Sequence, residues 1–379
     1  MSEKRSIFEE VKSEKPLDQE SQTPAVNLRT SKSNSALRIW LSLLFLLVAG
    51  MIVVGGLTRL TDSGLSITEW KPILGALPPL SFEMWQSEFD KYKMIPEYQI
   101  QNKSMSLQEF KIIYWWEWGH RQLGRIVGLV WLIGFSWLYF SKRLNRLWIS
   151  RAILLGSLGG FQGLIGWWMV SSGLTGRMVD VASYRLAVHL GLAFVIISLI
   201  TWYIVDSATD DHEKLRSQRV REEQYLPLVN ILLGLVFLQI LLGALVAGID
   251  AGRGYTDWPL MNGEFLPSES FDYSPFLSNF TENPALVQFN HRILGYLTMI
   301  YTVYIWFKCR NSSFNLTSRR ANFVVLIILL QMVMGIITIL NAASLNWALL
   351  HQFGAILIIV AVQYLRYQVY FPARQSVTA

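Results

Sequence analysis

The sequence predicts an all-α polytopic membrane protein whose eight transmembrane helices form two pseudo-symmetric four-helix bundles. Three observations support this fold class. The chain of 379 residues is 52% hydrophobic and only 16% charged, with 15 tryptophans, a composition typical of integral membrane proteins. Apolar runs of about 20 residues, the length that crosses a bilayer, recur along the chain. Motifs of the first half also return in the second half.

Eight apolar runs are long enough to cross a membrane. They lie at residues 37–58, 112–140, 150–171, 184–205, 226–249, 286–308, 320–341 and 346–369. Ser106 and Glu109 have the spacing of a capping box, so the second helix is expected to begin before its apolar run. Asn283 followed by Pro284 predicts an N-cap and a first helical residue for the sixth helix.

The order of these runs divides the chain into segments. Residues 1–36 are polar and mixed in charge, without the apolar run of a signal peptide, and their acidic content is unlike a mitochondrial transit peptide. We therefore expect a disordered cytoplasmic tail there. The remaining expected segments are an N-terminal bundle at 37–205 with an outer loop at 59–111, a cytoplasmic linker at 206–225, a C-terminal bundle at 226–370 and a tail at 371–379.

The distribution of basic residues predicts the orientation. Lys and Arg gather in the loops between helices 2 and 3, 4 and 5, and 6 and 7, whereas the loop between helices 7 and 8 has none. The positive-inside rule therefore places both termini in the cytoplasm. The net charge of +6 follows from these loops and is not taken as a signal for nucleic-acid binding. The single cysteine, Cys309, excludes an intramolecular disulfide.

Two pairs of matching segments indicate an internal repeat. Residues 55–64 after helix 1 resemble residues 243–252 after helix 5, and residues 161–166 in helix 3 resemble residues 330–335 in helix 7. Each half contains four predicted helices, an even number. The two halves should therefore share one orientation and be related by an axis along the membrane normal.

Four of the five histidines, His120, His189, His291 and His351, fall one on each even-numbered helix, near its outer end. Each bundle then carries two histidines at similar depth on different helices, which suits axial ligation of a haem iron. An interfacial histidine without a ligand is a common alternative for any one of them. Zinc suits this set poorly, because the second half has no nearby carboxylate or thiol.

Charged residues flank the first histidine of each bundle. Arg121 and Arg125 follow His120, and Arg292 follows His291; such arginines can pair with haem propionates or anchor the helices at the interface. Glu117 precedes His120 by three residues, and Gln288 occupies the matching place in the second half. This difference predicts that only the first site moves protons, with Glu117 as the base or relay. The alternative is a structural role, in which Glu117 neutralises Arg121 or fixes a histidine N–H.

These motifs resemble the haem A synthase family of the proteobacterial and mitochondrial type, over nearly all of residues 37–370. The most specific segments are 55–66, 70–72 and 117–121, together with the four helix-borne histidines. The resemblance implies that haem O is oxidised at its C8 methyl group to a formyl group by successive hydroxylation, giving haem A for cytochrome c oxidase. It also implies that His120 and His189 bind the substrate haem, that His291 and His351 bind a haem B cofactor, and that Glu117 is catalytic.

Several expectations accompany this resemblance. The protein would lie in the bacterial inner membrane, with its haem sites near the periplasmic face and with Arg59, Arg121, Arg125 and Arg292 available for propionates or positioning. Haem O synthase and cytochrome c oxidase assembly factors are candidate partners, and a second copy of the chain, giving a homo-oligomer, is another. The electron donor is unidentified, since no nicotinamide or flavin fingerprint is present. The main alternative is a di-haem b-type electron-transfer cytochrome, which would use the same four histidines.

Overall fold

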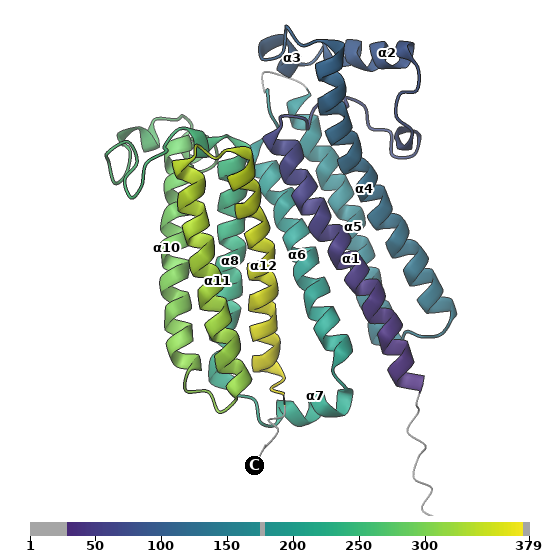
Figure 1. Ribbon diagram of the computed structural model, residues 1–379, viewed down its shortest axis with the longest axis vertical. Coiled ribbons are helices and arrows are strands. Elements are labelled where there is room, and N and C mark those ends of the chain that lie inside the picture. Colours follow the sequence, from purple (N-terminus) through teal and green to yellow (C-terminus); the bar gives the residue numbers. More distant parts are fainter. Residues whose placement is uncertain (1–28, 175–178, 374–379) are drawn as a thin grey trace, which may run out of the picture.

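The computed structural model describes residues 29–174 and 179–373, and this part of the chain is helical. The only strand-like pairing within these ranges is an isolated bridge between Met261 and Glu264. Long helices run side by side, as Figure 1 shows, and short helices and loops gather at their two ends. The expectation of an all-α protein is therefore confirmed.

The long helices pack as two rings. In the N-terminal ring each helix contacts the next in the order α1, α4, α5, α6 and back to α1; the bounds are α1 (Arg29–Leu60), α4 (Leu107–Phe140), α5 (Arg146–Gly173) and α6 (Ser183–Ala208). The C-terminal ring follows the same order with α8 (Leu226–Gly248), α10 (Pro284–Cys309), α11 (Asn315–Leu340) and α12 (Leu345–Tyr370). Contacts of α6 with α8 and α12, and of α1 with α12, join the rings.

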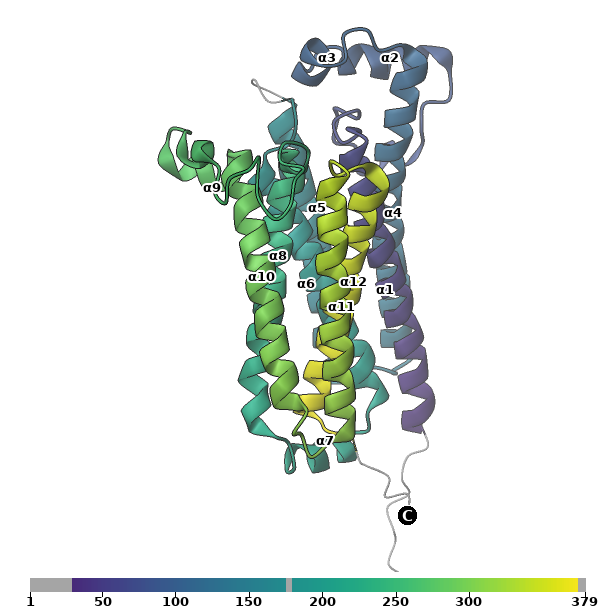
Figure 2. The same cartoon turned by 60° about the vertical axis from the view of Figure 1, so that its left-hand side comes forward.

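Shorter elements cover the ends of the rings (Figure 2). One end, called here the loop end, carries η1 (Leu74–Ala76), α2 (Phe82–Tyr92) and α3 (Pro96–Ile100) from the first long loop. The second long loop adds η3 (Ala251–Arg253), η4 (Ser268–Phe271), η5 (Phe276–Ser278) and α9 (Asn279–Glu282). The opposite end carries α7 (Asp211–Gln218) and η2 (Glu223–Tyr225) between the rings.

Within the described residues, seven helices are long and apolar enough to cross a membrane: α1, α4, α5, α6, α8, α11 and α12. The chain is thus a multi-pass membrane protein. Large apolar side chains such as Leu129, Ile133 and Phe323 are more than half exposed on these helices, as expected for surfaces that face lipid. The helix α10 is equally long, but its first turns carry Gln288, Asn290, His291 and Arg292, which lower its mean hydropathy.

The predicted helix starts can be checked at their caps. Ser106 and Glu109 form both bonds of the capping box at the start of α4, and the Asn283 side chain accepts from the backbone at the start of α10. The first helix begins at Arg29, earlier than the expected boundary at 37, so residues 29–36 are helical and not part of a tail. The expected tail at 1–28 and most of the one at 371–379 lie outside the described residues.

Candidate functional site

The four helix-borne histidines lie in equivalent settings near the loop end, each against a glycine of the neighbouring helix. A Cβ atom added to Gly55 on α1 would lie 3.0 Å from the imidazole Cε1 of His120 on α4. The same contact would measure 2.9 Å for Gly166 and His189, 3.1 Å for Gly243 and His291, and 3.0 Å for Gly335 and His351. The glycines therefore make room for the four rings between closely packed helices.

Glutamine side chains fix three of the four histidines. Nε2 of Gln162 donates to the backbone carbonyl of His189 at 2.9 Å, Gln239 does the same to His291 at 2.9 Å, and Gln331 to His351 at 2.8 Å. Each amide also lies within 3.5 Å of a ring nitrogen of its histidine. Gln162 and Gln331 lie in the matching segments 161–166 and 330–335, but no role was predicted for them or for Gln239. The repeated Gln-x-x-x-Gly spacing on α5, α8 and α11 was a usable signal.

The C-terminal pair has the spacing of two imidazoles that share one iron. His291 and His351 lie on α10 and α12, which stand diagonally in the ring, and their ring centroids are 6.4 Å apart with an angle of 81° between planes. Metal–imidazole bonds are about 2 Å long, so a metal held between two rings separates the ring centres by about 6 Å. The described residues contain no cluster of three or more His, Cys, Asp or Glu that suits a bare metal ion. Zinc in proteins is held by three or four such side chains, so two imidazoles suit a haem iron better than zinc.

The N-terminal histidine pair has ring nitrogens that can bind a ligand. His120 and His189 stand on α4 and α6, the corresponding diagonal of the other ring. In the described part of the chain, the buried Nδ1 atoms of both rings have no hydrogen-bond partner. Buried polar atoms without partners are uncommon and call for an explanation such as an absent ligand. A ligand held between these two helices would meet that requirement.

Glu117 lies beside His120 and is only 2% exposed. Its Oε2 accepts bonds from the Ser66 hydroxyl and the Ile67 backbone N–H, both at 2.7 Å. Its Oε1 accepts from Nε and Nη2 of Arg121 at 3.0 and 2.6 Å. The carboxylate thus joins α4 to the chain that follows α1, and the ion pair foreseen as the alternative role of Glu117 is present.

Gln288 makes the matching connection in the C-terminal ring, but it donates hydrogen bonds to the loop where Glu117 accepts them. Its Nε2 donates to the carbonyls of Ala251 and Tyr255 at 2.7 and 3.2 Å, and its Oε1 accepts from Nη2 of Arg292 at 2.7 Å. In the first half the loop presents N–H and O–H donors to a carboxylate. In the second half it presents carbonyls to an amide.

The arginines beside the histidines hold loop carbonyls. Arg121 donates to Ile67 and Glu69 at 2.8 and 3.0 Å, and Arg292 donates to Tyr255 and Leu260. The guanidinium of Arg125 donates to the carbonyls of residues 71 and 72 at 3.1 and 2.9 Å. Their contact with propionates stays a prediction, and the contacts described here tie the loops to the helices.

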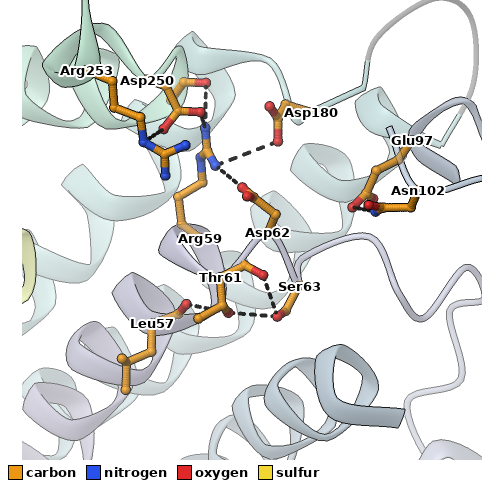
Figure 3. Close-up of polar contacts among 11 residues, drawn as sticks. Leu57, Arg59, Thr61, Asp62, Ser63, Glu97, Asn102, Asp180, Asp250 and Arg253 are labelled. Carbon is orange, nitrogen blue, oxygen red and sulfur yellow. Dashed lines mark hydrogen bonds and ion pairs between the residues drawn. The ribbon is translucent and has the colours of Figure 1, made fainter. Parts of the chain in front are cut away.

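Arg59 lies at the junction of the two rings, as Figure 3 shows. Its guanidinium pairs with Asp62 and Asp250 at 2.9 Å each and lies 3.7 Å from Asp180. Asp62 and Asp250 occupy matching positions of the repeat, and both have positive φ, 48° and 52°. Burial raises the pKa of the Asp180 carboxyl. Arg59 therefore links the turns that follow α1 and α8.

A second link runs from the C-terminal histidines to the N-terminal ring. Gln352, next to His351, donates to the backbone carbonyl of Ile52 on α1 at 2.6 Å. Its side chain also fills the space that a Cβ atom of Gly56 would need. Gly56 adjoins Gly55, which packs against His120. The two histidine pairs are therefore connected through only a few side chains.

Glu97 on α3 is a further buried carboxyl that sequence reasoning missed. It is 3% exposed. Nδ2 of Asn102 donates to its carboxyl at 3.5 Å and to the hydroxyl of Tyr92 at 2.8 Å. Burial raises the pKa of Glu97 to about 8. The carboxyl is therefore largely protonated at neutral pH and belongs to the core of the first loop.

Comparison with known proteins adds a family and close relatives. Residues 38–363 match the family COX15-CtaA, described as cytochrome oxidase assembly protein. A protein of Dinoroseobacter shibae named "Heme A synthase" is 55% identical over 99% of this chain and 98% of its own length. Proteins of the same name from Roseobacter denitrificans and Paracoccus denitrificans are 49% and 47% identical, covering 100% and 99% of this chain and 99% and 98% of their own lengths.

Proposed function

The chain belongs to the COX15-CtaA family of cytochrome oxidase assembly proteins, and on this premise we propose that it synthesises haem A. The substrate is haem O, and its C8 methyl group is oxidised by successive hydroxylation to a formyl group. The product supplies cytochrome c oxidase. Relatives named "Heme A synthase" support this proposal because they match the chain from end to end. They give no support to the alternative of a di-haem electron-transfer cytochrome.

In this proposal each ring holds one haem. His291 and His351 hold haem B, which supplies one-electron redox chemistry when bound. The 6.4 Å separation of their rings supports this assignment. His120 and His189 hold the substrate haem, whose iron would satisfy a ring nitrogen of each. Gln239 and Gln331 fix both ligands of the cofactor site by bonding to their backbone carbonyls.

Glu117 is the residue proposed to handle protons during oxidation of the methyl group. It is buried beside a ligand of the substrate site, and the matching residue of the cofactor site is an amide that cannot take up a proton. Its bonds with Ser66, Ile67 and Arg121 hold the carboxylate in one position. They also hold the first loop over the N-terminal ring, which would restrict entry of water. This difference between the two sites is the observation that carries the proposal.

We further propose that α10 is the eighth membrane span and that the two rings are related by pseudo-symmetry. The equal helix order and the four equivalent Gly–His contacts support this arrangement. Both termini would then lie in the cytoplasm of the bacterial cell, and the loop end, with the haem sites, near the periplasmic face. The lipid bilayer, haem O synthase, assembly factors of cytochrome c oxidase and an electron donor are the proposed partners.

The test is haem extraction and chromatography from cells that supply haem O, with and without this protein. Haem A, or its alcohol precursor, is expected only when the protein is present. A folded, haem-loaded protein that leaves haem O unchanged in the presence of a reductant and oxygen would refute the proposal. The alternative cytochrome would give that second result.

A further inference from the structure

The helices that flank the histidines share one pattern, from which α1 departs. On α5, α8 and α11 a glutamine precedes the histidine-contacting glycine by four residues, as Gln162, Gln239 and Gln331. The residue four positions before Gly55 on α1 is Met51. His120 is therefore the one helix-borne histidine without a glutamine at this position.

Met51 occupies the place on α1 that Gln239 occupies on α8. A Cβ atom added to Gly124, four residues after His120, would lie 3.2 Å from Cε of Met51. A Cβ atom added to Gly295, four residues after His291, would lie 3.3 Å from Nε2 of Gln239. The thioether thus stands where the amide of Gln239 stands in the C-terminal ring.

The exchange of an amide for a thioether changes how firmly the histidine is held. Each amide nitrogen bonds to the backbone of the histidine helix and lies against the ring, which restricts the orientation of the imidazole. Such contacts behind a metal ligand typically alter metal affinity by about 10- to 100-fold. Methionine has no donor and is flexible. Packing against Gly55 is then the main restraint on the His120 ring.

We propose that Met51 makes His120 the ligand that releases the iron, so that haem enters and leaves the N-terminal site by dissociation from His120. The inference rests on the proposed function, in which this haem is a substrate whose product must depart. The C-terminal pair has an amide behind each ring, which suits a cofactor that stays bound. Met51 is a positioning residue here, since it acts through His120.

The test measures transfer of haem B from the purified full-length protein, loaded at both sites, to an excess of apomyoglobin. The expected time course has a fast phase from the N-terminal site and a slow phase from the C-terminal site. Met51→Gln should slow the fast phase by about 10-fold, because it installs the missing amide. Met51→Leu, which has a similar volume and no donor, is the matched control and should leave both phases unchanged.

The reciprocal variant, Gln239→Met, should accelerate the slow phase and leave the fast phase alone. Equal fast rates for Met51→Gln and Met51→Leu would overturn the inference, and so would a Met51→Gln variant that slows only the slow phase. Failure of the proposed function is recognised separately, as wild-type protein that forms no haem A. The transfer rates are read without turnover and therefore test the role of Met51 in either case.

Discussion

Substitution of Glu117 by glutamine separates the two roles that the structure allows for this residue. The change preserves size and removes the charge and the proton-accepting oxygen. A glutamine carbonyl oxygen can still accept from Arg121, as Oε1 of Gln288 does from Arg292 at 2.7 Å. The amide nitrogen would then replace Oε2, which accepts from the Ser66 hydroxyl and the Ile67 N–H.

The size of the effect on folding follows from these contacts. The Ser66 hydroxyl can rotate and accept from the new amide, whereas the buried Ile67 N–H loses its acceptor. One such unsatisfied donor costs about 1–3 kcal/mol, and the lost charge of the pair with Arg121 adds to it. Folded proteins have about 5–15 kcal/mol of stability, so the variant should still fold and bind haem. Loss of a general base lowers a rate by about 10²- to 10⁴-fold.

The assay therefore compares haem A formation with haem content and thermal unfolding in the same preparation. Glu117→Gln should keep both haems and lose most of its activity, with haem O or the alcohol precursor accumulating. Ser66→Ala is the control, because it removes one bond to the same oxygen and leaves the carboxylate in place. Near-normal haem A formation by Glu117→Gln would refute a role in proton transfer. Equal losses in both variants would assign Glu117 to holding the loop.

Three further outcomes are expected. His291→Ala should lose one haem B per chain in the pyridine haemochrome spectrum, whereas His212→Ala, a change on α7 outside the histidine sites, should retain it. Gly56→Ala should lower the melting temperature more than Gln352→Ala, and the double variant should recover part of the loss, since the added methyl group needs the space of Gln352. Burial raises the pKa of Glu97 to about 8 in the folded protein, from an ordinary value of 4.5, so the stability of the protein should fall as the pH rises between these two values. Glu97→Gln should flatten this decline in melting temperature.

The long helices were predictable because hydrophobic length and capping act locally. Ser106 and Asn283 mark their helix starts by side chains that bond within the next turn, so sequence spacing is sufficient. The helix α1 begins at Arg29, before the apolar run that starts at residue 37. This extension was not predictable, since the residues before 37 are polar and a helix that extends beyond an apolar run leaves no hydropathy signal. The setting of the histidines depends on contacts between helices, and the roles of Gln239 and Gln331 were accordingly missed.

The arginines illustrate a second limit of sequence reasoning. Arg121 and Arg292 directly follow His120 and His291 in the chain, and charge at a membrane boundary suggests a charged ligand. A guanidinium carries five donors, however, and a loop end offers many carbonyl oxygens. Arg121 and Arg292 bond to such carbonyls, while Arg59 pairs with carboxylates from both rings. Composition alone cannot distinguish these partners from a propionate.

The differences between the two rings both lie at the histidine site of the N-terminal ring. In the C-terminal ring both histidines have an amide behind them, and Gln288 binds the loop through groups that do not exchange a proton. The N-terminal ring replaces one amide by Met51 and the loop-binding amide by Glu117. Since the loop of the first half presents donors and that of the second half presents carbonyls, Gln288→Glu would set a carboxylate against two carbonyl oxygens. A single substitution therefore cannot convert the C-terminal site into a copy of the N-terminal one; residue and loop must change together.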